Sequence, residues 1–409
     1  MSTDARHSSS PATSLRFTAL LASVTALTSL SIDAYLPAFP DMAAYFDEPI
    51  SKVSATVGVY MWGIAVGQLI GGYLSDRFRR KHILLAGLFI FILSCIGIAT
   101  QTTLQGVYIL RFFQALGGGF AIVSVPAIIR DRVSGNAAAK LFGMVGLITM
   151  CAPAAAPSLG TLILEFADWH GVFIFLTLYA IVVSLALMRG LKPATHHIPT
   201  MGKLTLVESF SMVLKNPLAL HFVGVMSMCY SVVLIFVTNA SMLYQEHFAA
   251  SKRLFSILFA ANIATMICSM LVSRSLIGKV RPVKVLRTGV LIQSVTLIGL
   301  CLAYSLRPEL TTVVPFLMIS VGIVGAIGPN VQACFLEFFP RNAGVAASIL
   351  GTLQFLISGA LSTASAWVSG EYGVLPLFGL MATCATLALV SAWPTPQKFD
   401  AALTASLQA

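Results

Sequence analysis

The sequence predicts an all-α membrane protein with about twelve spanning helices. Three observations support this fold class: the composition, the number of long apolar runs, and the placement of basic residues. Of the 409 residues, 57% are hydrophobic and only 10% are charged, whereas a soluble domain has about 25% charged residues. A soluble core of this length cannot bury so much apolar surface, so the lipid bilayer must be its solvent.

Twelve apolar runs are long enough to cross a bilayer, which takes about 20 residues of helix. The longest segment without such a run is 189–217, and we expect it to be a cytoplasmic linker between two six-helix bundles at 15–188 and 218–395. Residues 1–14 are expected to be a disordered cytoplasmic N-terminus and 396–409 a cytoplasmic tail. The predicted spans are 16–36, 53–73, 83–100, 107–129, 139–164, 172–188, 218–244, 254–276, 283–304, 312–335, 343–368 and 374–393.

The basic residues gather on one side of the predicted membrane. If both termini are cytoplasmic, Lys52, Lys252, Arg253 and Arg307 lie outside, Arg111 lies within a span, and the rest of the 25 lysines and arginines lie inside. This is the positive-inside pattern, and an error in the span count would scramble it. The pattern also accounts for the net charge of +10 without nucleic acid as a partner.

The sequence argues against an enzyme and against a metal site or cofactor. The seven cysteines stand singly in apolar runs, without a CxxC or a Cys/His cluster, so we expect neither a metal site nor a disulfide framework. Neither HExxH nor GxSxG occurs, and no predicted span holds a cluster of His and carboxylate groups.

Two ionisable residues lie well inside the predicted spans: Asp33, near the outer end of the first, and Arg111, early in the fourth. A charge in hydrocarbon costs at least about 2.5–3.5 kcal/mol, so each should face the bundle interior or a water-filled cavity. A carboxyl group there can bind a proton or a cationic substrate. Two structural alternatives stay open: Asp33 could cap a helix end, because Pro37 disrupts the helix beyond it, and Arg111 could only bond backbone carbonyls.

Span five combines small residues with two prolines. Ala152, Ala156 and Gly160 share one face, and Pro153 and Pro157 lie beside them. Two prolines one turn apart remove two backbone hydrogen bonds and bend a helix. The pattern predicts a gating helix, with ordinary close packing of small residues as the alternative.

The loop after span two is basic but contains one acid. It includes Gly72, Asp76, Arg77 and Arg80, and a second acid in a basic setting, Asp131, follows span four. Asp76 could pair with Arg77 or Arg80, or lie at a helix N-terminus where the dipole favours an anion. We expect the two loops to form a charge network that locks one conformation, so that breaking it acts as a switch.

The polar residues of the spans are the candidates for substrate contact. An amide left unpaired in the membrane costs free energy, so such residues need partners or a ligand. The spans are also rich in Met and Phe, which adapt to varied ligands but could equally face lipid. The candidates for the substrate cavity are Tyr35, Asn239, Asn262, Asn330 and Gln354.

Four motifs together resemble the major facilitator superfamily, specifically its proton-coupled drug exporters of the Bcr/CflA type. They are DAYLPAFP (33–40), GYLSDRFRRK (72–81), LRFFQALG (110–117) and APAAAPSLG (152–160). Two positions depart from the family pattern: Arg79 replaces a glycine of the loop motif, and Thr161 replaces the second glycine usual in span five.

The resemblance implies a major facilitator fold that moves a small molecule by alternating access of two six-helix halves. It implies proton-coupled efflux across the bacterial inner membrane, with Asp33 exchanging the proton, Arg111 tuning it, and the protein working as a monomer. It also implies that the loop motif serves as the switch and that Pro153, Pro157 and Gly160 mark the gating helix. An exporter of an endogenous metabolite or siderophore, or an importer or facilitator of the same fold, stays open as an alternative, although the span-five motif favours export.

Overall fold

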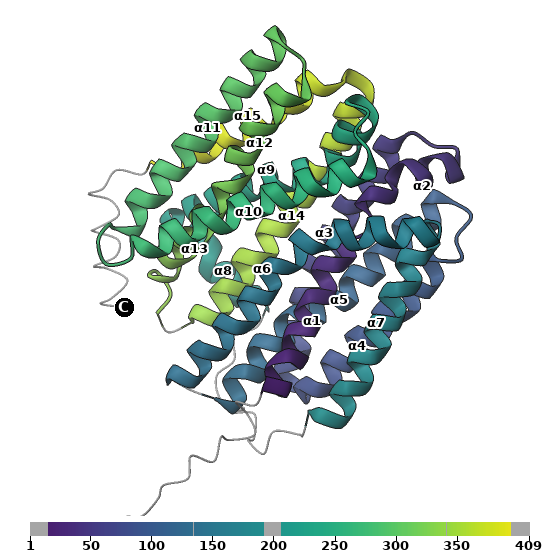
Figure 1. Ribbon diagram of the computed structural model, residues 1–409. Helices are drawn as coiled ribbons and strands as arrows, with labels where there is room; N and C mark the ends of the chain where they lie inside the picture. The colour runs from purple at the N-terminus through teal and green to yellow at the C-terminus, as the bar shows by residue number, and fades with distance from the viewer. Residues whose placement is uncertain (1–14, 134, 192–205, 341, 394–409) are drawn as a thin grey trace, which may run out of the picture.

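The computed structural model describes residues 15–133, 135–191, 206–340 and 342–393, and it is almost entirely helical (Figure 1). Within this described part, twelve helical segments are long and apolar enough to span a membrane, as the sequence predicts. The elements are α1 (Leu15–Asp33), η2 (Leu36–Ala38), α2 (Phe39–Phe46), α3 (Ile50–Arg77), α4 (Arg80–Ile98), α5 (Leu104–Arg132), α6 (Gly135–Phe166), α7 (Trp169–Gly190), α8 (Leu206–Leu214), α9 (Pro217–Ser241), η3 (Met242–His247), α10 (Lys252–Ser275), α11 (Pro282–Leu306), α12 (Leu310–Gly322), α13 (Val324–Leu336), α14 (Ala343–Tyr372) and α15 (Val374–Ser391).

The first span is longer than predicted and is broken in its middle. It runs over Arg16–Phe46, but α1 stops at Asp33 and the chain continues through a turn, the short 3₁₀-helix η2 and then α2. Pro37 and Pro40 lie in the first turns of η2 and α2, where a helix needs no backbone donor. Asp33 therefore lies near the middle of the span, which corrects its predicted place near the outer end.

Two further departures from regular helix, and one additional helix, were not predicted. The tenth span is divided at Ile323 into α12 and α13, and the seventh ends in a π-helical segment, η3. The predicted linker contains the helix α8, which packs against α9 and α14. At the first of these breaks, a side chain on Gly325 would overlap the backbone oxygen of Met266, so glycine lets α13 lie directly against α10.

The spans pack as two groups that meet along two helix pairs. The first six spans (α1 to α7) contact mainly one another, and so do the last six (α9 to α15). The largest contact between the groups joins α3 to α14, and the second joins α6 to α10. On the α3–α14 side, a side chain on Gly58 would collide with the backbone of Gly359, so these two helices touch at backbone distance.

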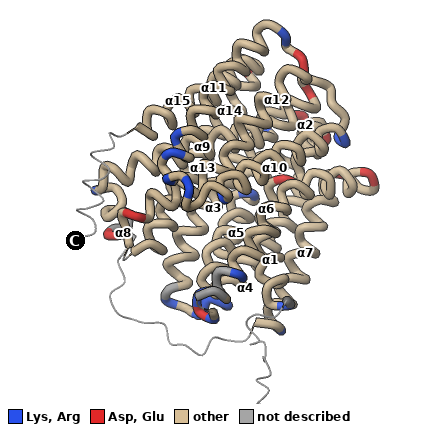
Figure 2. Tube along the Cα trace, turned by 60° about the vertical axis from the view of Figure 1, so that its left-hand side comes forward, with Lys and Arg blue, Asp and Glu red and all other residues tan. Residues whose placement is uncertain are grey.

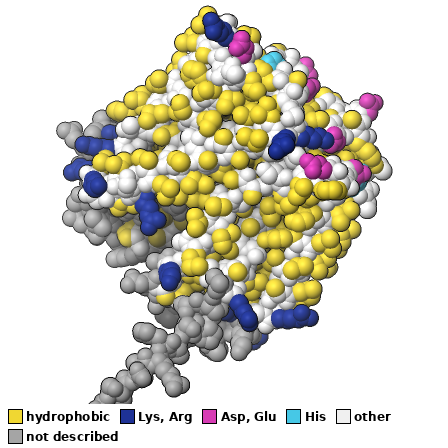
Figure 3. Space-filling model, in the orientation of Figure 1, with side chains coloured by type: hydrophobic (Ala, Val, Ile, Leu, Met, Phe, Trp, Pro, Cys, Tyr) yellow, Lys and Arg dark blue, Asp and Glu magenta, His cyan; other side chains and the backbone are white. Residues whose placement is uncertain are grey.

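Charged residues occupy opposite ends of the bundle, with an apolar band between them (Figures 2 and 3). We call these the basic end and the acidic end. The basic end carries Arg77, Arg80, Lys81, Arg130, Arg132, Lys140, Arg189, Arg274, Lys279, Arg281, Lys284 and Arg287, and the acidic end carries Asp41, Asp47, Glu48, Glu165, Asp168, Glu246, Glu309 and Glu371 together with Lys52, Lys252, Arg253 and Arg307.

Candidate functional site

A central cavity of about 330 Å³ lies between the two groups of helices. The first six spans supply most of its wall, and the last six add only Tyr230 and Phe355, whose rings meet edge to face at 5.6 Å between centroids. Among the described residues, no charged side chain lines the cavity, and its polar groups are hydroxyls. The lining residues from the first six spans are Thr25, Thr28, Ser29, Ile32, Met61, Ile64, Ile122, Val125, Pro126, Ile129, Phe142, Val145 and Thr149.

On the α6–α10 side, α6 is less closely packed toward the basic end. In the basic half of α6, a side chain on Gly143 or Gly146 would meet nothing within 4 Å, and Leu147 is 61% exposed. At the acidic end, by contrast, the Thr161 and Ser256 hydroxyls bond across α6 and α10 at 2.9 Å. The two helices therefore touch near the acidic end and separate toward the basic end.

Asp33 is the only buried carboxylate among the described residues, with 5% of its surface exposed. It is the last residue of α1, so its carboxyl lies where the helix stops. It takes part in no hydrogen bond or ion pair within the described part of the chain, so nothing here supports the alternative that it merely caps a helix. Its neighbour Ile32 lines the cavity, as does Tyr230 of the other half.

Arg111 is the only buried cation of the described residues, and it is fully buried. The guanidinium carbon lies 4.2 Å from the ring centre of Tyr35 and 4.3 Å from that of Tyr60, so the cation is held between two aromatic faces. Its Nη1 donates to the Ser31 backbone oxygen at 3.0 Å and to the Gln114 side-chain oxygen at 2.7 Å. Nε and Nη2 have no hydrogen-bond partner in the part of the chain that the structure describes.

The Arg111 surroundings bear on both predictions made for it. The bond to a backbone carbonyl exists, but it uses one nitrogen only. Arg111 does not contact Asp33; the link between them is the α1 backbone, because Ser31 lies two residues before Asp33. Reasoning from the sequence missed Tyr60 and Gln114, although Gln114 follows Arg111 by three positions and so shares its helix face.

The basic loops are joined by side-chain contacts. Arg80 Nε donates to Asp131 Oδ2 at 2.5 Å, which connects the α3–α4 junction to the end of α5. Lys81 Nζ donates to the backbone oxygens of Met188 and Leu191 at 2.8 and 2.7 Å and so caps the end of α7.

The rest of the predicted switch loop is less constrained. Arg77 stacks on Tyr73 at 4.1 Å. A side chain on Gly72 would meet open space, so packing does not require glycine there. The side chain of Asp76 lies outside the described residues. The role of these loops as a switch stays a prediction.

The gating-helix residues lie on α6 beside the break in the first span. Pro153 and Pro157 are inside the helix, which continues through both. A side chain on Gly160 would overlap the backbone oxygen of Ala34, the residue directly after Asp33. Glycine therefore allows α6 to rest on the break itself, which joins the predicted gating helix to the candidate proton site.

The five residues predicted to contact substrate do not line the cavity. Tyr35 is buried against Arg111, with its hydroxyl bonded to Thr56 at 2.9 Å. Asn239 is held by Ser365 and Ser369, at 2.8 and 2.7 Å.

The other three amides are also placed in helix contacts. Asn262 bonds to the Leu258 backbone and Asn330 to the Ser273 side chain, while Gln354 is buried next to the lining residue Phe355. Asn239 is thus bonded at both its amide nitrogen and its amide oxygen, whereas the Asn262 side-chain oxygen is buried without a hydrogen-bond partner among the described residues.

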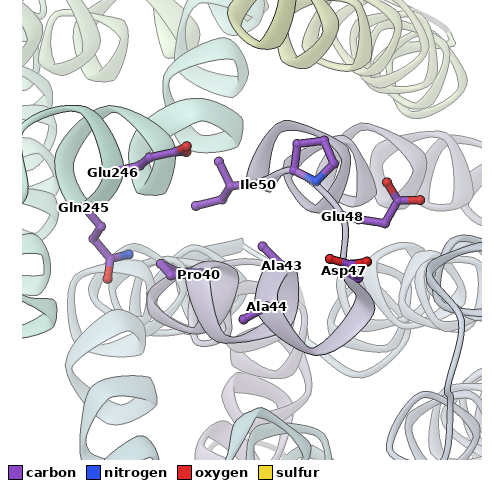
Figure 4. A pocket seen from close by; sticks show the side chains of 9 residues that line it. Pro40, Ala43, Ala44, Asp47, Glu48, Ile50, Gln245 and Glu246 are labelled. Atoms are coloured by element: carbon purple, nitrogen blue, oxygen red, sulfur yellow. The ribbon is translucent and has the colours of Figure 1, made fainter.

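A second hollow of about 510 Å³ lies at the acidic end, between α2 and η3 (Figure 4). Gln245 and Glu246 of η3 face Pro40 and Ile50 across it. Residues of both groups of helices line this hollow. Its other lining residues are Ala43, Ala44, Asp47, Glu48 and Pro49.

Comparisons with known proteins agree with the family resemblance. Residues 21–363 match the Major Facilitator Superfamily. The chain is 26% identical to the bicyclomycin resistance protein homolog of Haemophilus influenzae over 89% of this chain and 92% of that protein. It is 28% identical to a chloramphenicol resistance protein of Pseudomonas aeruginosa, over 84% and 82%, and 28% identical to the multidrug resistance protein MdtL of Klebsiella pneumoniae, over 88% and 90%.

The fold is also that of a solved transporter. A crystal structure of a D-xylose-proton symporter superposes with a TM-score of 0.75 over 92% of this chain and 97% of the other, at 15% identity. The predicted major facilitator fold is thus confirmed, and with the bacterial relatives the spans indicate a multi-pass protein of the inner membrane. The chain is a transporter of small molecules rather than an enzyme, and it belongs to the Major Facilitator Superfamily.

Proposed function

We propose that the protein exports drug-like small molecules from the cytoplasm in exchange for protons, by alternating access of its two six-helix halves. The observation that carries this proposal is Asp33: a buried, unpartnered carboxyl group between an uncharged cavity and the helix break on which α6 rests. Relatives named for resistance to bicyclomycin, chloramphenicol and multiple drugs support the direction and the kind of cargo.

In the proposed orientation the basic end and both termini face the cytoplasm, as the positive-inside rule requires. A conformation with the cavity open toward the basic end would then load substrate from the cytoplasm. An uncharged wall of hydroxyls, aliphatic groups and two aromatic rings suits a compact, largely apolar molecule. The protein is proposed to act as a monomer, because one chain encloses the whole cavity.

Proton entry drives the cycle in the export direction. Asp33 takes up a proton that enters from the acidic end of the protein and releases it to the cytoplasm. Moving one charge through a potential of 100 mV supplies about 2.3 kcal/mol, which corresponds to accumulation of roughly fiftyfold. Arg111 supplies a fixed positive charge near the proton site. Pro153, Pro157 and Gly160 form the part of α6 that moves when the protein changes conformation.

The loops at the basic end are proposed to hold the resting conformation. The pair Arg80–Asp131 ties the α3–α4 junction to α5, and Gly72, Asp76 and Arg77 belong to the same proposed switch. Opening the acidic end would require this network to break and remake.

An importer or facilitator is the second candidate, and the fold shared with a proton-driven sugar symporter favours it. An exporter of an endogenous metabolite or siderophore would use the same cavity. Direction is decided in inside-out vesicles, where an exporter accumulates its substrate when protons are more concentrated inside.

The decisive test of proton coupling is Asp33→Asn in proteoliposomes with an imposed pH gradient. We expect proton-driven transport to fall to the level of passive exchange, because an amide cannot take up and release the proton. The control is Asp47→Asn, the same change at an exposed site where the left-handed backbone (φ 52°) suits asparagine. Undiminished proton-driven transport by Asp33→Asn would refute this role.

The cargo is identified by a susceptibility panel. Cells that overexpress the gene, cells that lack it, and cells that express Asp33→Asn are compared over neutral and cationic antibiotics. We expect resistance to rise only with the unmodified chain. A panel without any difference would point to a metabolite as the exported molecule.

A further inference from the structure

Two side chains one turn apart on α10 bind the other half of the protein at the acidic end. Lys252 Nζ lies 2.6 Å from Asp41 Oδ2 on α2, which forms an ion pair between the halves. Ser256 hydrogen-bonds the Thr161 hydroxyl of α6 at 2.9 Å. Ser256 also bonds the backbone oxygen of Lys252, at 3.1 Å, so both contacts start from the same helical turn.

One of these contacts depends on a residue that departs from the family pattern. Thr161 stands where a second glycine is usual in the span-five motif, one position after Gly160. A glycine has no hydroxyl, so it could not bond Ser256. The departure thus adds a polar contact between the halves directly beside the place where α6 rests on the broken first span.

The position of the two contacts lets them influence the conformational change of the transport cycle. On the α6–α10 side the helices separate toward the basic end, where Gly143, Gly146 and Leu147 are open. The Lys252 turn therefore joins α10 to α2 and α6 at the acidic end of this side. Opening the acidic end requires both contacts to break.

The strength of the contacts suits a step that must be reversed in every cycle. The side chains of Lys252 and Asp41 are 38% and 39% exposed. An ion pair with this exposure changes an equilibrium by only about two- to fivefold, and one neutral hydrogen bond has an effect of similar size. Such contacts bias a conformational ratio without locking it.

We propose that Asp41, Thr161, Lys252 and Ser256 form a latch, the acidic-end latch, that positions α10 against α2 and α6 and sets the ratio of inward-open to outward-open protein. This proposal rests on the alternating-access cycle proposed above. The four are positioning residues: they do not line the cavity, and they act through the helices that close it.

The test measures the conformational ratio directly and independently of transport. Spin labels are placed at Phe166→Cys and Arg253→Cys, exposed positions at the acidic ends of α6 and α10. The accessible cysteines Cys151, Cys268 and Cys301 are replaced by serine, and the other four cysteines are buried. Distance distributions are recorded by double electron–electron resonance on the full chain in lipid nanodiscs.

We expect Asp41→Asn and Lys252→Gln each to raise the population with widely separated labels about two- to fivefold, and Thr161→Val to act in the same direction. The exchanged pair Asp41→Lys with Lys252→Asp should return the ratio toward that of the unmodified chain. The matched control is Lys52→Gln, which breaks the ion pair with Glu48 (2.7 Å) at the same end but within one half. It should leave the ratio unchanged.

Each result has a definite meaning. The proposal is overturned if the Asp41 and Lys252 variants give the same distributions as the unmodified chain, if Lys52→Gln shifts them equally, or if the exchanged pair fails to restore the ratio. If the unmodified chain transports nothing in any imposed gradient but the latch variants still shift the ratio, the latch stands and the proposed export function fails. Thr161→Ser keeps the hydroxyl and should behave as the unmodified chain.

Discussion

Gly160 of α6 offers a test of how tightly the gating helix rests on the broken first span. A Cβ atom at this position would overlap the backbone oxygen of Ala34 and would also press on its carbonyl carbon. A methyl group cannot avoid the contact by rotating, and the opposing atoms are backbone. Gly160→Ala must therefore push α6 away from α1 at the residue that follows Asp33.

The size of the effect is best obtained from two variants of the same helix. Forcing an extra carbon into a filled contact costs about 1–3 kcal/mol, while replacing glycine by alanine inside a helix gains about 0.5–1 kcal/mol. Gly146→Ala has only the gain, because a side chain there meets nothing within 4 Å. Helix propensity cancels in the difference, so Gly160→Ala should be less stable than Gly146→Ala by about 1–3 kcal/mol.

Thermal unfolding of the two purified variants in one detergent measures this difference, and proteoliposome transport measures its consequence. We expect Gly146→Ala to match or exceed the unmodified chain in stability and to transport normally. Gly160→Ala should unfold at a lower temperature and transport poorly. Equal stability of the two variants would refute the reasoning, because it would mean that α6 does not rest on the Ala34 backbone.

Two further predictions concern charged groups. Arg111→Lys keeps the charge but loses the planar contact with Tyr35 and Tyr60. The variant should be less stable by roughly 2 kcal/mol and should not transport. Transport and thermal stability are measured together, and normal transport would show that the charge alone suffices. Asp131→Asn removes the partner of Arg80, whose side chain is 24% exposed. The stability of the protein should therefore change by less than about 1 kcal/mol, while the transport rate changes severalfold. A transport rate equal to that of the unmodified chain would exclude the proposed switch.

The spans and the two buried charges could be predicted from the sequence for simple physical reasons. Apolar runs of bilayer length are visible without any knowledge of packing, and the positive-inside pattern checks their number independently. Asp33 and Arg111 could be found because a charge within an apolar run is costly wherever the helix faces. Both are buried in the structure.

The helix breaks were harder to predict because hydropathy does not register them. The segments on both sides of the break after Asp33 are apolar, so hydropathy did not reveal the break. The predicted first span also ended at Leu36, ten residues before Phe46, where the span ends in the structure. The break at Ile323 follows a glycine within a strongly apolar run, and whether such a glycine bends a helix depends on the neighbouring helix. Only the close approach of α13 to α10 decides it.

The cavity lining could not be predicted because it depends on which partners the polar residues find. Asn239 resembles a ligand-binding residue in the sequence, but Ser365 and Ser369 on α14 lie within its reach. Tyr230 and Phe355 line the cavity. In the sequence, nothing distinguishes these two aromatic residues from aromatic residues that face lipid. Pairing between distant helices decides these roles, and one sequence does not reveal it.

The sandwich of Arg111 between two tyrosine rings has a consequence for the electrical behaviour of transport. Among the described residues no carboxylate pairs with this cation, so Asp33, their one buried carboxylate, is left to carry a proton in the proposed cycle. With one proton per cycle, export of a neutral molecule moves one positive charge inward and responds to the membrane potential. Export of a monovalent cation is electrically silent and responds to the pH gradient alone, at about 1.4 kcal/mol per pH unit.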